Sequence, residues 1–238
     1  MACHGFKGRK VKTKRPFAFL MTRTIVYIDG FNLYYRACKP SGHKWLDIAA
    51  LSAAVLPATA QITQINYYTA RVSGRVDPTA PARQHAYLRA LGSLPLVKIT
   101  YGNFRTDKKW AGLVQPPEFR PACTLPPGAA PQVAYVWKTE EKGSDVNLGV
   151  HLVRDAYTDG FEEAAILTND TDLTEPVRIV TQEVGLPVTL LVPSSKPAAS
   201  LVAVASHVRH IQPYLGPCVF PDPVTLPDGR TVAKPGGW

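Results

Sequence analysis

The chain has 238 residues, of which 45% are hydrophobic and 19% charged, and its formal net charge is +9. This length suits one medium domain with extensions or two small domains, and the apolar fraction is ample for a packed core. No apolar run approaches the roughly 20 residues of a membrane span. The basic N-terminal segment lacks the pattern of a secretory signal. We therefore expect a cytoplasmic protein with no membrane partner.

The positive charge is concentrated at the N-terminus. Residues 1–23 hold seven of the 27 Lys and Arg residues and none of the 18 acids. We predict a basic, disordered tail over residues 1–22, which either attracts polyanions without sequence preference or has no role. The four cysteines form no CxxC pair, so a zinc site is disfavoured and free thiols are the simpler interpretation.

Strand-like and helix-like segments alternate along the rest of the chain. The predicted strands cover residues 24–28, 62–72, 96–104, 163–170 and 187–194. The predicted helices cover residues 46–56, 80–94, 143–157, 173–185 and 199–211. Six prolines mark residues 105–134 as an irregular insertion, and residues 213–238 form a Pro/Gly-rich extension with a turn at Asp228-Gly229.

This alternation predicts an α/β protein whose central, mostly parallel sheet is covered by helices on both faces. In such sheets the working site lies beyond the carboxyl ends of the strands. Asp29 ends the first strand, Asp170 and Asp172 follow the fourth, and Asp145 opens the helix at 143–157. We therefore expect three separate segments to bring four carboxylates to one rim.

Four carboxylates close together repel one another unless a cation neutralises them. Oxygen ligands without His or Cys favour Mg²⁺ or Mn²⁺, which serve phosphoryl chemistry. Each acid also has a structural interpretation. Asp29 before Gly30 suits a turn, Asp145 suits a helix N-cap, and Asp172 with Glu175 suits a capping box. Both interpretations stay open on the sequence alone.

Three stretches, "VYIDGFNLYY", "KGSDVNLGVHLVRDA" and "ILTNDTDLTEPV", resemble the NYN domain, a branch of the PIN-like nuclease superfamily. Their order and spacing match over roughly residues 23–212. The resemblance implies a Rossmann-like, three-layer α/β/α sandwich and a metal-dependent ribonuclease. It implies these functional positions: Asp29, Asp145, Asp170 and Asp172 as metal-binding acids, Asn32 as a polar site residue, and Thr168 and Asn169 as substrate-contacting positions. The insertion at 105–134 is less typical of the family.

Basic side chains near these acids are candidates for phosphate contacts. Lys142, three residues before Asp145, either contacts a phosphate or is a solvated loop lysine, and Lys138 is a weaker candidate of the same kind. The insertion combines charge with an aromatic ring, as an RNA-contacting loop does, in Arg105, Lys108, Lys109 and Trp110.

Other polar residues receive ordinary structural roles. His207 and His210 would share one face of the last predicted helix, without Cys or His partners. Asp155 is expected to be solvated. Tyr34 and Tyr35 are expected to pack in the fold, with stacking of one of them on a base as the alternative.

The leading functional hypothesis is an endoribonuclease that uses Mg²⁺ or Mn²⁺ to activate water, leaving a 5′-phosphate and a 3′-hydroxyl. One alternative is an RNA-binding module whose acids catalyse nothing. Another is a phosphatase or nucleotidase acting on small phosphoesters. RNA is the expected partner, and a homo-oligomer or a regulatory protein partner is compatible with the sequence.

Overall fold

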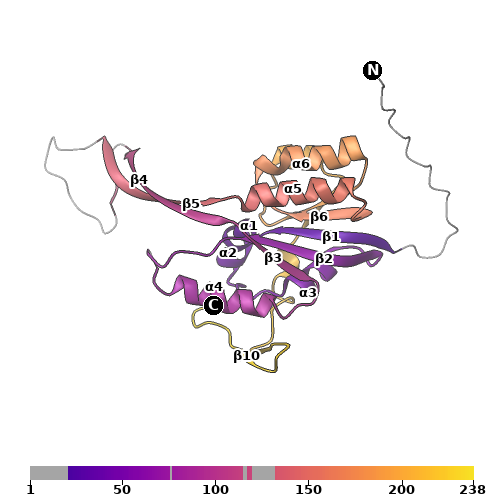
Figure 1. Cartoon of the computed structure of the whole chain (residues 1–238), viewed down its shortest axis with the longest axis horizontal. Coiled ribbons are helices and arrows are strands. Elements are labelled where there is room, and N and C mark those ends of the chain that lie inside the picture. Colours follow the sequence, from indigo (N-terminus) through magenta and orange to yellow (C-terminus); the bar gives the residue numbers. More distant parts are fainter. Residues whose placement is uncertain (1–20, 76, 115–116, 120–131) are drawn as a thin grey trace, which may run out of the picture.

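The centre of the molecule is a six-stranded parallel sheet in the order β3-β2-β1-β6-β7-β8 (Figure 1). This computed structural model describes residues 21–75, 77–114, 117–119 and 132–238. The strands are β1 Thr22–Asp29, β2 Ala60–Thr69, β3 Val97–Tyr101, β6 Glu163–Leu167, β7 Val188–Val192 and β8 His207–His210. The predicted α/β sandwich with a parallel sheet is therefore confirmed.

Helices cover both faces of the sheet (Figure 1). One face carries α1 Gly30–Leu33, α2 Lys39–Ser41, α3 Ile48–Val55 and α4 Ala80–Leu91. The other face carries α5 Ser144–Tyr157, α6 Thr174–Arg178 and α7 Ala199–Val204. Shorter turns extend them at Tyr34–Cys38, Thr171–Leu173, Ile179–Val184 and Gln212–Tyr214. None of these helices, within the part of the chain that the structure describes, has the length and apolar content needed to cross a bilayer.

Strand β1 separates two hydrophobic cores. Successive side chains of a strand point to opposite faces of the sheet. Val26 and Ile28 accordingly join the core under α3, whereas Ile25 and Tyr27 join the core under α5. Both faces of β1 are buried, so its sequence is a continuous run of β-forming residues. Such a run is typical of a central strand in a parallel sheet.

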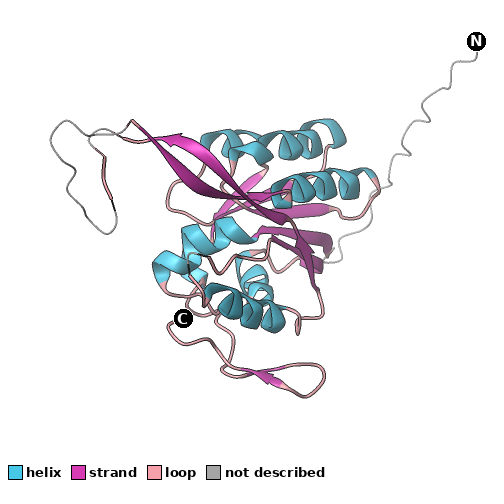
Figure 2. Ribbon diagram, turned by 60° about the vertical axis from the view of Figure 1, so that its left-hand side comes forward, coloured by secondary structure: helices cyan, strands magenta, loops and turns pink. Residues whose placement is uncertain are grey.

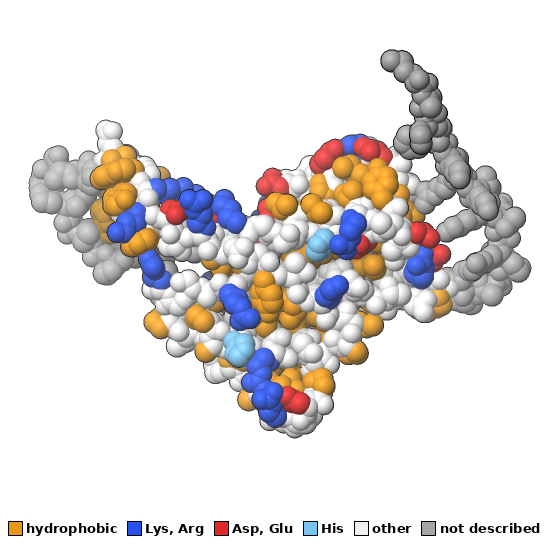
Figure 3. All heavy atoms as spheres, viewed as in Figure 1, with side chains coloured by type: hydrophobic (Ala, Val, Ile, Leu, Met, Phe, Trp, Pro, Cys, Tyr) orange, Lys and Arg blue, Asp and Glu red, His pale blue; other side chains and the backbone are white. Residues whose placement is uncertain are grey.

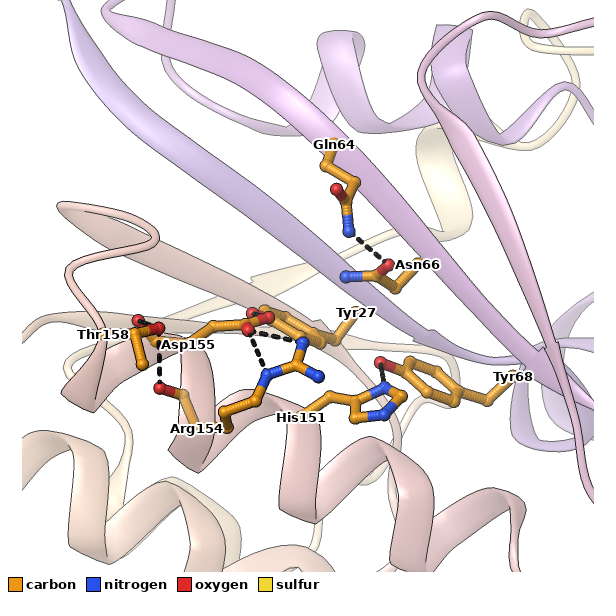
Figure 4. A network of polar contacts seen from close by, with 8 residues as sticks. All are labelled: Tyr27, Gln64, Asn66, Tyr68, His151, Arg154, Asp155 and Thr158. Carbon is orange, nitrogen blue, oxygen red and sulfur yellow. Dashed lines mark hydrogen bonds and ion pairs between the residues drawn. The ribbon is translucent and has the colours of Figure 1, made fainter.

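A polar network under α5 fastens this helix to the sheet (Figure 4). The Tyr27 hydroxyl donates to Asp155 Oδ2 at 2.7 Å, and Arg154 Nε donates to Asp155 Oδ1 at 2.8 Å. The Tyr68 hydroxyl lies 3.0 Å from His151 Nδ1. Burial and the bond to Asp155 raise the pKa of Tyr27 above its ordinary value. The prediction of a solvated Asp155 is wrong, because its side chain turns under the helix toward β1.

Two antiparallel strands, β4 Asn103–Gly112 and β5 Val133–Lys142, form a ribbon that projects from the body of the molecule (Figures 1 and 2). We call this ribbon the arm. The prediction of an irregular insertion at 105–134 is therefore wrong at both of its ends. The six prolines all fall between the two strands in the sequence, in a segment most of which is outside the described residues.

The last predicted helix is only half correct. Residues 199–204 form α7, but β8 then pairs in parallel with β7, in a register that places Thr189 opposite His207. His207 and His210 are therefore exposed strand residues and do not share a helical face. Edge pairing with β7 outweighs the apolar helical pattern of this segment.

The C-terminal extension packs on the domain. The predicted hairpin forms from β9 Val224–Thr225 and β10 Thr231–Val232, on either side of the turn at Asp228-Gly229. Val224 and Val232 are buried in the core under α3. At the other terminus, the predicted basic tail lies outside the described residues as far as residue 20.

Candidate active site at the carboxyl rim

The rim of the sheet brings together the ends of β1 and β6. These strands are paired in parallel, with Ile28 opposite Leu167. Asp29 and Thr168, the next residues of the two segments, are consequently neighbours. The Thr168 hydroxyl donates to Asp29 Oδ2 at 3.3 Å. Two segments that are 139 residues apart in sequence thus meet at one carboxylate.

Asp29 is buried, with 7% of its surface exposed, and its carboxylate caps α1. Its Oδ1 accepts from the backbone N–H groups of Phe31 at 3.1 Å and Asn32 at 3.0 Å. Its Oδ2 accepts from Asn32 Nδ2 at 2.6 Å in addition to Thr168. These four donors occupy the lone-pair positions of the carboxylate. Burial raises the pKa of Asp29, while these hydrogen bonds partly offset the increase.

Asn32 links α1 to the chain that follows β6. Its Nδ2 group donates to Asp29, while its Oδ1 accepts from Arg36 Nε at 2.9 Å and from the backbone N–H of Asn169 at 3.3 Å. Gly30 makes this arrangement feasible, because a Cβ there would lie 2.7 Å from the carbonyl oxygen of Tyr68. Asn32 therefore orients the first carboxylate.

Asp170 lies on the same rim as Asp29. Its backbone N–H donates to Thr168 Oγ1 at 3.1 Å, and its charge contributes to the raised pKa of Asp29. Asp170 Oδ1 accepts from the backbone N–H of Asp172 at 3.2 Å. One buried hydroxyl, that of Thr168, thus connects the Asp29 carboxylate to the backbone of Asp170.

Asn169 is held by the loop after β7. Its Nδ2 donates to Ser194 Oγ at 3.2 Å and to the carbonyl of Lys196 at 3.1 Å, and its Oδ1 accepts from Ala198 N at 2.7 Å. Both ends of the amide are engaged. The expected substrate contact of Asn169 stays a prediction, and its visible role is to close this loop over the rim.

Asp145 and Asp172 line a shallow cavity between α5 and α6. Its volume is about 650 Å³, and Val146 and Gly149 also line it. Asp145 lies in the first turn of α5, where its charge is favourable to the helix dipole. The N-cap interpretation of Asp145 is wrong, because the N-cap of α5 is Gly143, but a charge in the first turn of α5 is compatible with a functional role.

The two candidate lysines lie at the base of the arm. Lys142 Nζ pairs with Glu140 Oε2 at 3.2 Å, and Lys138 pairs with the same glutamate. Both lysines are exposed, so the ion pairs are weak in water. A phosphate would therefore compete with Glu140 for either lysine.

A second cavity, of about 480 Å³, opens behind α1. Aromatic side chains surround it, namely Phe31, Tyr34, Tyr35, Tyr67, Tyr87 and Trp238. Lys39, Lys44 and Arg83 supply cations to its walls, and Asp77, also in the lining, is paired with Arg83. Trp238 Nε1 is buried, and no partner for it exists among the described residues. The aromatic "FNLYY" run was the only sequence signal of this cavity, and packing accounted for it equally well.

Comparisons with known proteins decide the family. A model of the NYN domain matches residues 23–212. The chain is an NYN-domain protein. A curated relative is 29% identical over 91% of this chain and 75% of its own length, and it is named 6-hydroxy-3-succinoylpyridine 3-monooxygenase HspA, from Pseudomonas putida (strain DSM 28022 / S16). A protein of unknown function from Vibrio parahaemolyticus RIMD 2210633, VPA0982, is 16% identical, with a TM-score of 0.47 over 82% of this chain and 95% of that chain.

The rim of this NYN domain fits a divalent metal in the kind of ligand that it offers. Asp145, Asp170 and Asp172 all present hard carboxylate oxygens, which Mg²⁺ and Mn²⁺ prefer. The positions of these acids, however, do not form a complete metal site. Among the described residues, no three His, Cys, Asp or Glu side chains are placed to hold one metal. Asp29 is already saturated by hydrogen bonds, so its predicted role as a ligand stays a prediction.

Proposed function

We propose that this NYN domain hydrolyses phosphodiester bonds in RNA at the carboxyl rim of its sheet. The observation that carries the proposal is that the Thr168 hydroxyl contacts both the Asp29 carboxylate and the backbone N–H of Asp170, so that the two acids come from adjoining segments of the rim. Membership of the NYN family supports the same conclusion, because this domain has a nuclease-like fold.

The rim residues divide into positioning and binding groups. Asp29 and Asn32 are positioning residues, because their side chains are hydrogen-bonded to each other and Asp29 also caps α1. Asp145, Asp170 and Asp172 are the candidate ligands for Mg²⁺ or Mn²⁺, and they would have to move closer together to share one ion, because no three acids are so placed among the described residues. When bound, the ion would activate a water molecule and neutralise charge on the phosphate. Lys138 and Lys142 would bind flanking phosphates in place of Glu140, as point charges.

Cleavage of structured RNA tests this proposal. We expect wild-type protein with Mn²⁺ or Mg²⁺ to release products with a 5′-phosphate and a 3′-hydroxyl. The Asp170→Asn variant should be slower by on the order of 100-fold, because a carboxylate that would hold the metal ion is lost and the ion is what neutralises charge on the phosphate. Mn²⁺ binding, followed by electron paramagnetic resonance, should weaken in the same variant.

Asp228→Asn, on the β9–β10 hairpin, is the matched control and should cleave like wild type. Equal cleavage by wild type and the Asp170 variant would contradict the assignment. Tight RNA binding without turnover in any divalent metal would favour a binding module instead. Turnover of an aryl phosphate but not of RNA would favour a phosphatase.

The aromatic cavity behind α1 supports a second candidate function. The Pseudomonas putida relative is named for a substituted pyridine, and rings and cations line this cavity. A small planar aromatic compound with an anionic group matches those walls by stacking and by charge.

Fluorescence titration with 6-hydroxynicotinate tests this candidate. We expect saturable quenching in wild type, because Trp238 lines the cavity. Affinity should fall at least about tenfold in Tyr34→Ala, which removes one of the aromatic walls. Tyr157→Ala, at the exposed end of α5, should bind like wild type. Linear, unsaturable quenching would reject this candidate.

A further inference from the structure

The arm carries two different faces. Cross-strand partners and residues two apart in a strand share one face of a ribbon. The register pairs Trp110 with Tyr135 and Lys108 with Trp137, so these four residues lie on one face. Arg105, Asp107, Lys109, Lys138, Glu140 and Lys142 lie on the other face. We call the first the aromatic face of the arm.

The aromatic face is exposed to an unusual degree. Trp110 is 68% exposed, Tyr135 58% and Trp137 54%. The rings of Trp110 and Tyr135 lie 5.1 Å apart. Large aromatic side chains normally gain stability from burial, and a two-stranded ribbon is marginal by itself. A row of solvent-exposed aromatic side chains on such a ribbon therefore indicates a binding surface.

Cations accompany these rings. Lys108 Nζ lies 4.7 Å from the centre of the Trp137 ring, and the Arg75 guanidinium lies 4.2 Å from it. Arg75 comes from the loop after β2, so the body of the protein contributes to the aromatic face. The opposite face carries four cations and two acids, and it pairs part of this charge internally, as in Arg105 with Asp107 at 2.6 Å. Figure 3 shows the Lys and Arg side chains gathered along the arm.

The aromatic face leads to the rim. Phe104 lies on the same face at the base of the arm, and its ring packs edge-on against Phe31 at 5.6 Å. The backbone N–H of Phe31 donates a hydrogen bond to Asp29 Oδ1. On the second strand, Lys142 is followed by Gly143 and then by α5, which carries Asp145. At the base of the arm, β4 thus begins near the segment that positions Asp29, and β5 ends three residues before Asp145.

We propose that the aromatic face of the arm binds single-stranded RNA and leads it to the carboxyl rim. Exposed rings interleaved with cations suit an unpaired strand, because its bases are free to stack and its phosphates attract the cations. A duplex offers no free base faces, so it should bind the arm only through charge. The binding is independent of the proposed hydrolysis, whereas the delivery to the rim rests on it.

Fluorescence anisotropy with a labelled oligouridine of about 12 nucleotides, in EDTA to prevent turnover, tests the inference. The double variant Trp110→Ala/Trp137→Ala should bind at least about tenfold more weakly than wild type. The corresponding double Phe variant should retain most of the affinity, because Phe also stacks. Lys108→Met should lower the slope of log K against log salt by about 0.7, since one phosphate contact is lost.

Tyr157→Ala removes an aromatic ring of similar exposure, 63%, from the far end of α5 and should bind RNA like wild type. Equal affinity of the double Ala variant and wild type would overturn the inference. A dimeric wild type together with a monomeric double Ala variant would also overturn the inference, because the aromatic face would then join two copies of the chain. If wild type binds the strand but cleaves no RNA in any divalent metal, the proposed hydrolysis fails while this binding surface stands.

Discussion

At the residue scale, Asp29 shows how one side chain serves local structure and the site together. Its Oδ1 caps α1, and its Oδ2 accepts a hydrogen bond from the hydroxyl of Thr168, which follows β6. Caps of this kind typically stabilise a protein by about 1 kcal/mol. Asp29 at the end of β1 and Asn32 three residues later thus form one hydrogen-bonded unit, which fixes the position of the Asp29 carboxylate at the rim.

The raised pKa of Asp29 predicts a pH-dependent stability. Burial lifts the pKa of Asp29 in the folded state above its ordinary value of 3.8, so the unfolded chain releases this proton first. The contribution of this group to the free energy of unfolding is full below the unfolded pKa. It is lost as the pH rises through the folded pKa. Asp29→Asn cannot titrate and lacks this dependence.

Urea unfolding across a pH series measures the effect. The stability of wild type minus that of Asp29→Asn should fall as the pH rises from about 4 toward neutrality. Asp228→Asn provides the comparison for an exposed acid. A difference between wild type and Asp29→Asn that stays constant with pH would mean that Asp29 titrates alike in both states.

At the scale of elements, local patterns predicted the central strands and failed where pairing decided the outcome. β1 and α5 have strong patterns and appear where the sequence predicts them. The arm was missed because the prolines between its strands dominated the composition of the insertion. β8 was missed because its segment continues the pattern of α7, and only the free edge of β7 makes it a strand.

At the scale of the whole molecule, the C-terminal extension completes the core under α3. Phe220 is buried against Trp45, with ring centres 5.8 Å apart, and Trp45 Nε1 donates to the carbonyl of Pro221 at 3.1 Å. The extension is therefore part of the packed unit, although its composition resembles that of a tail.

Truncating one ring tests this assignment. Phe220→Ala should lower the free energy of unfolding by about 3–5 kcal/mol, because it leaves a cavity beside Trp45. Its neighbour Val219, which is 38% exposed, is the matched control, and Val219→Ala should change stability by less than about 0.5 kcal/mol. Urea unfolding measures both variants, and equal effects would mean that the extension contributes little to the core.

The sequence by itself determined the alternation of strands and helices, the NYN family and the acids that end the strands. These features are local: they depend on periodicity and on residue types close together in the chain. Only the tertiary structure decided that Asp29 is saturated by hydrogen bonds, that Asp155 is buried under α5, and that the arm exposes an aromatic face. Each of these depends at least in part on groups far apart in sequence, such as Thr168 for Asp29, and such contacts exist only in the folded sheet.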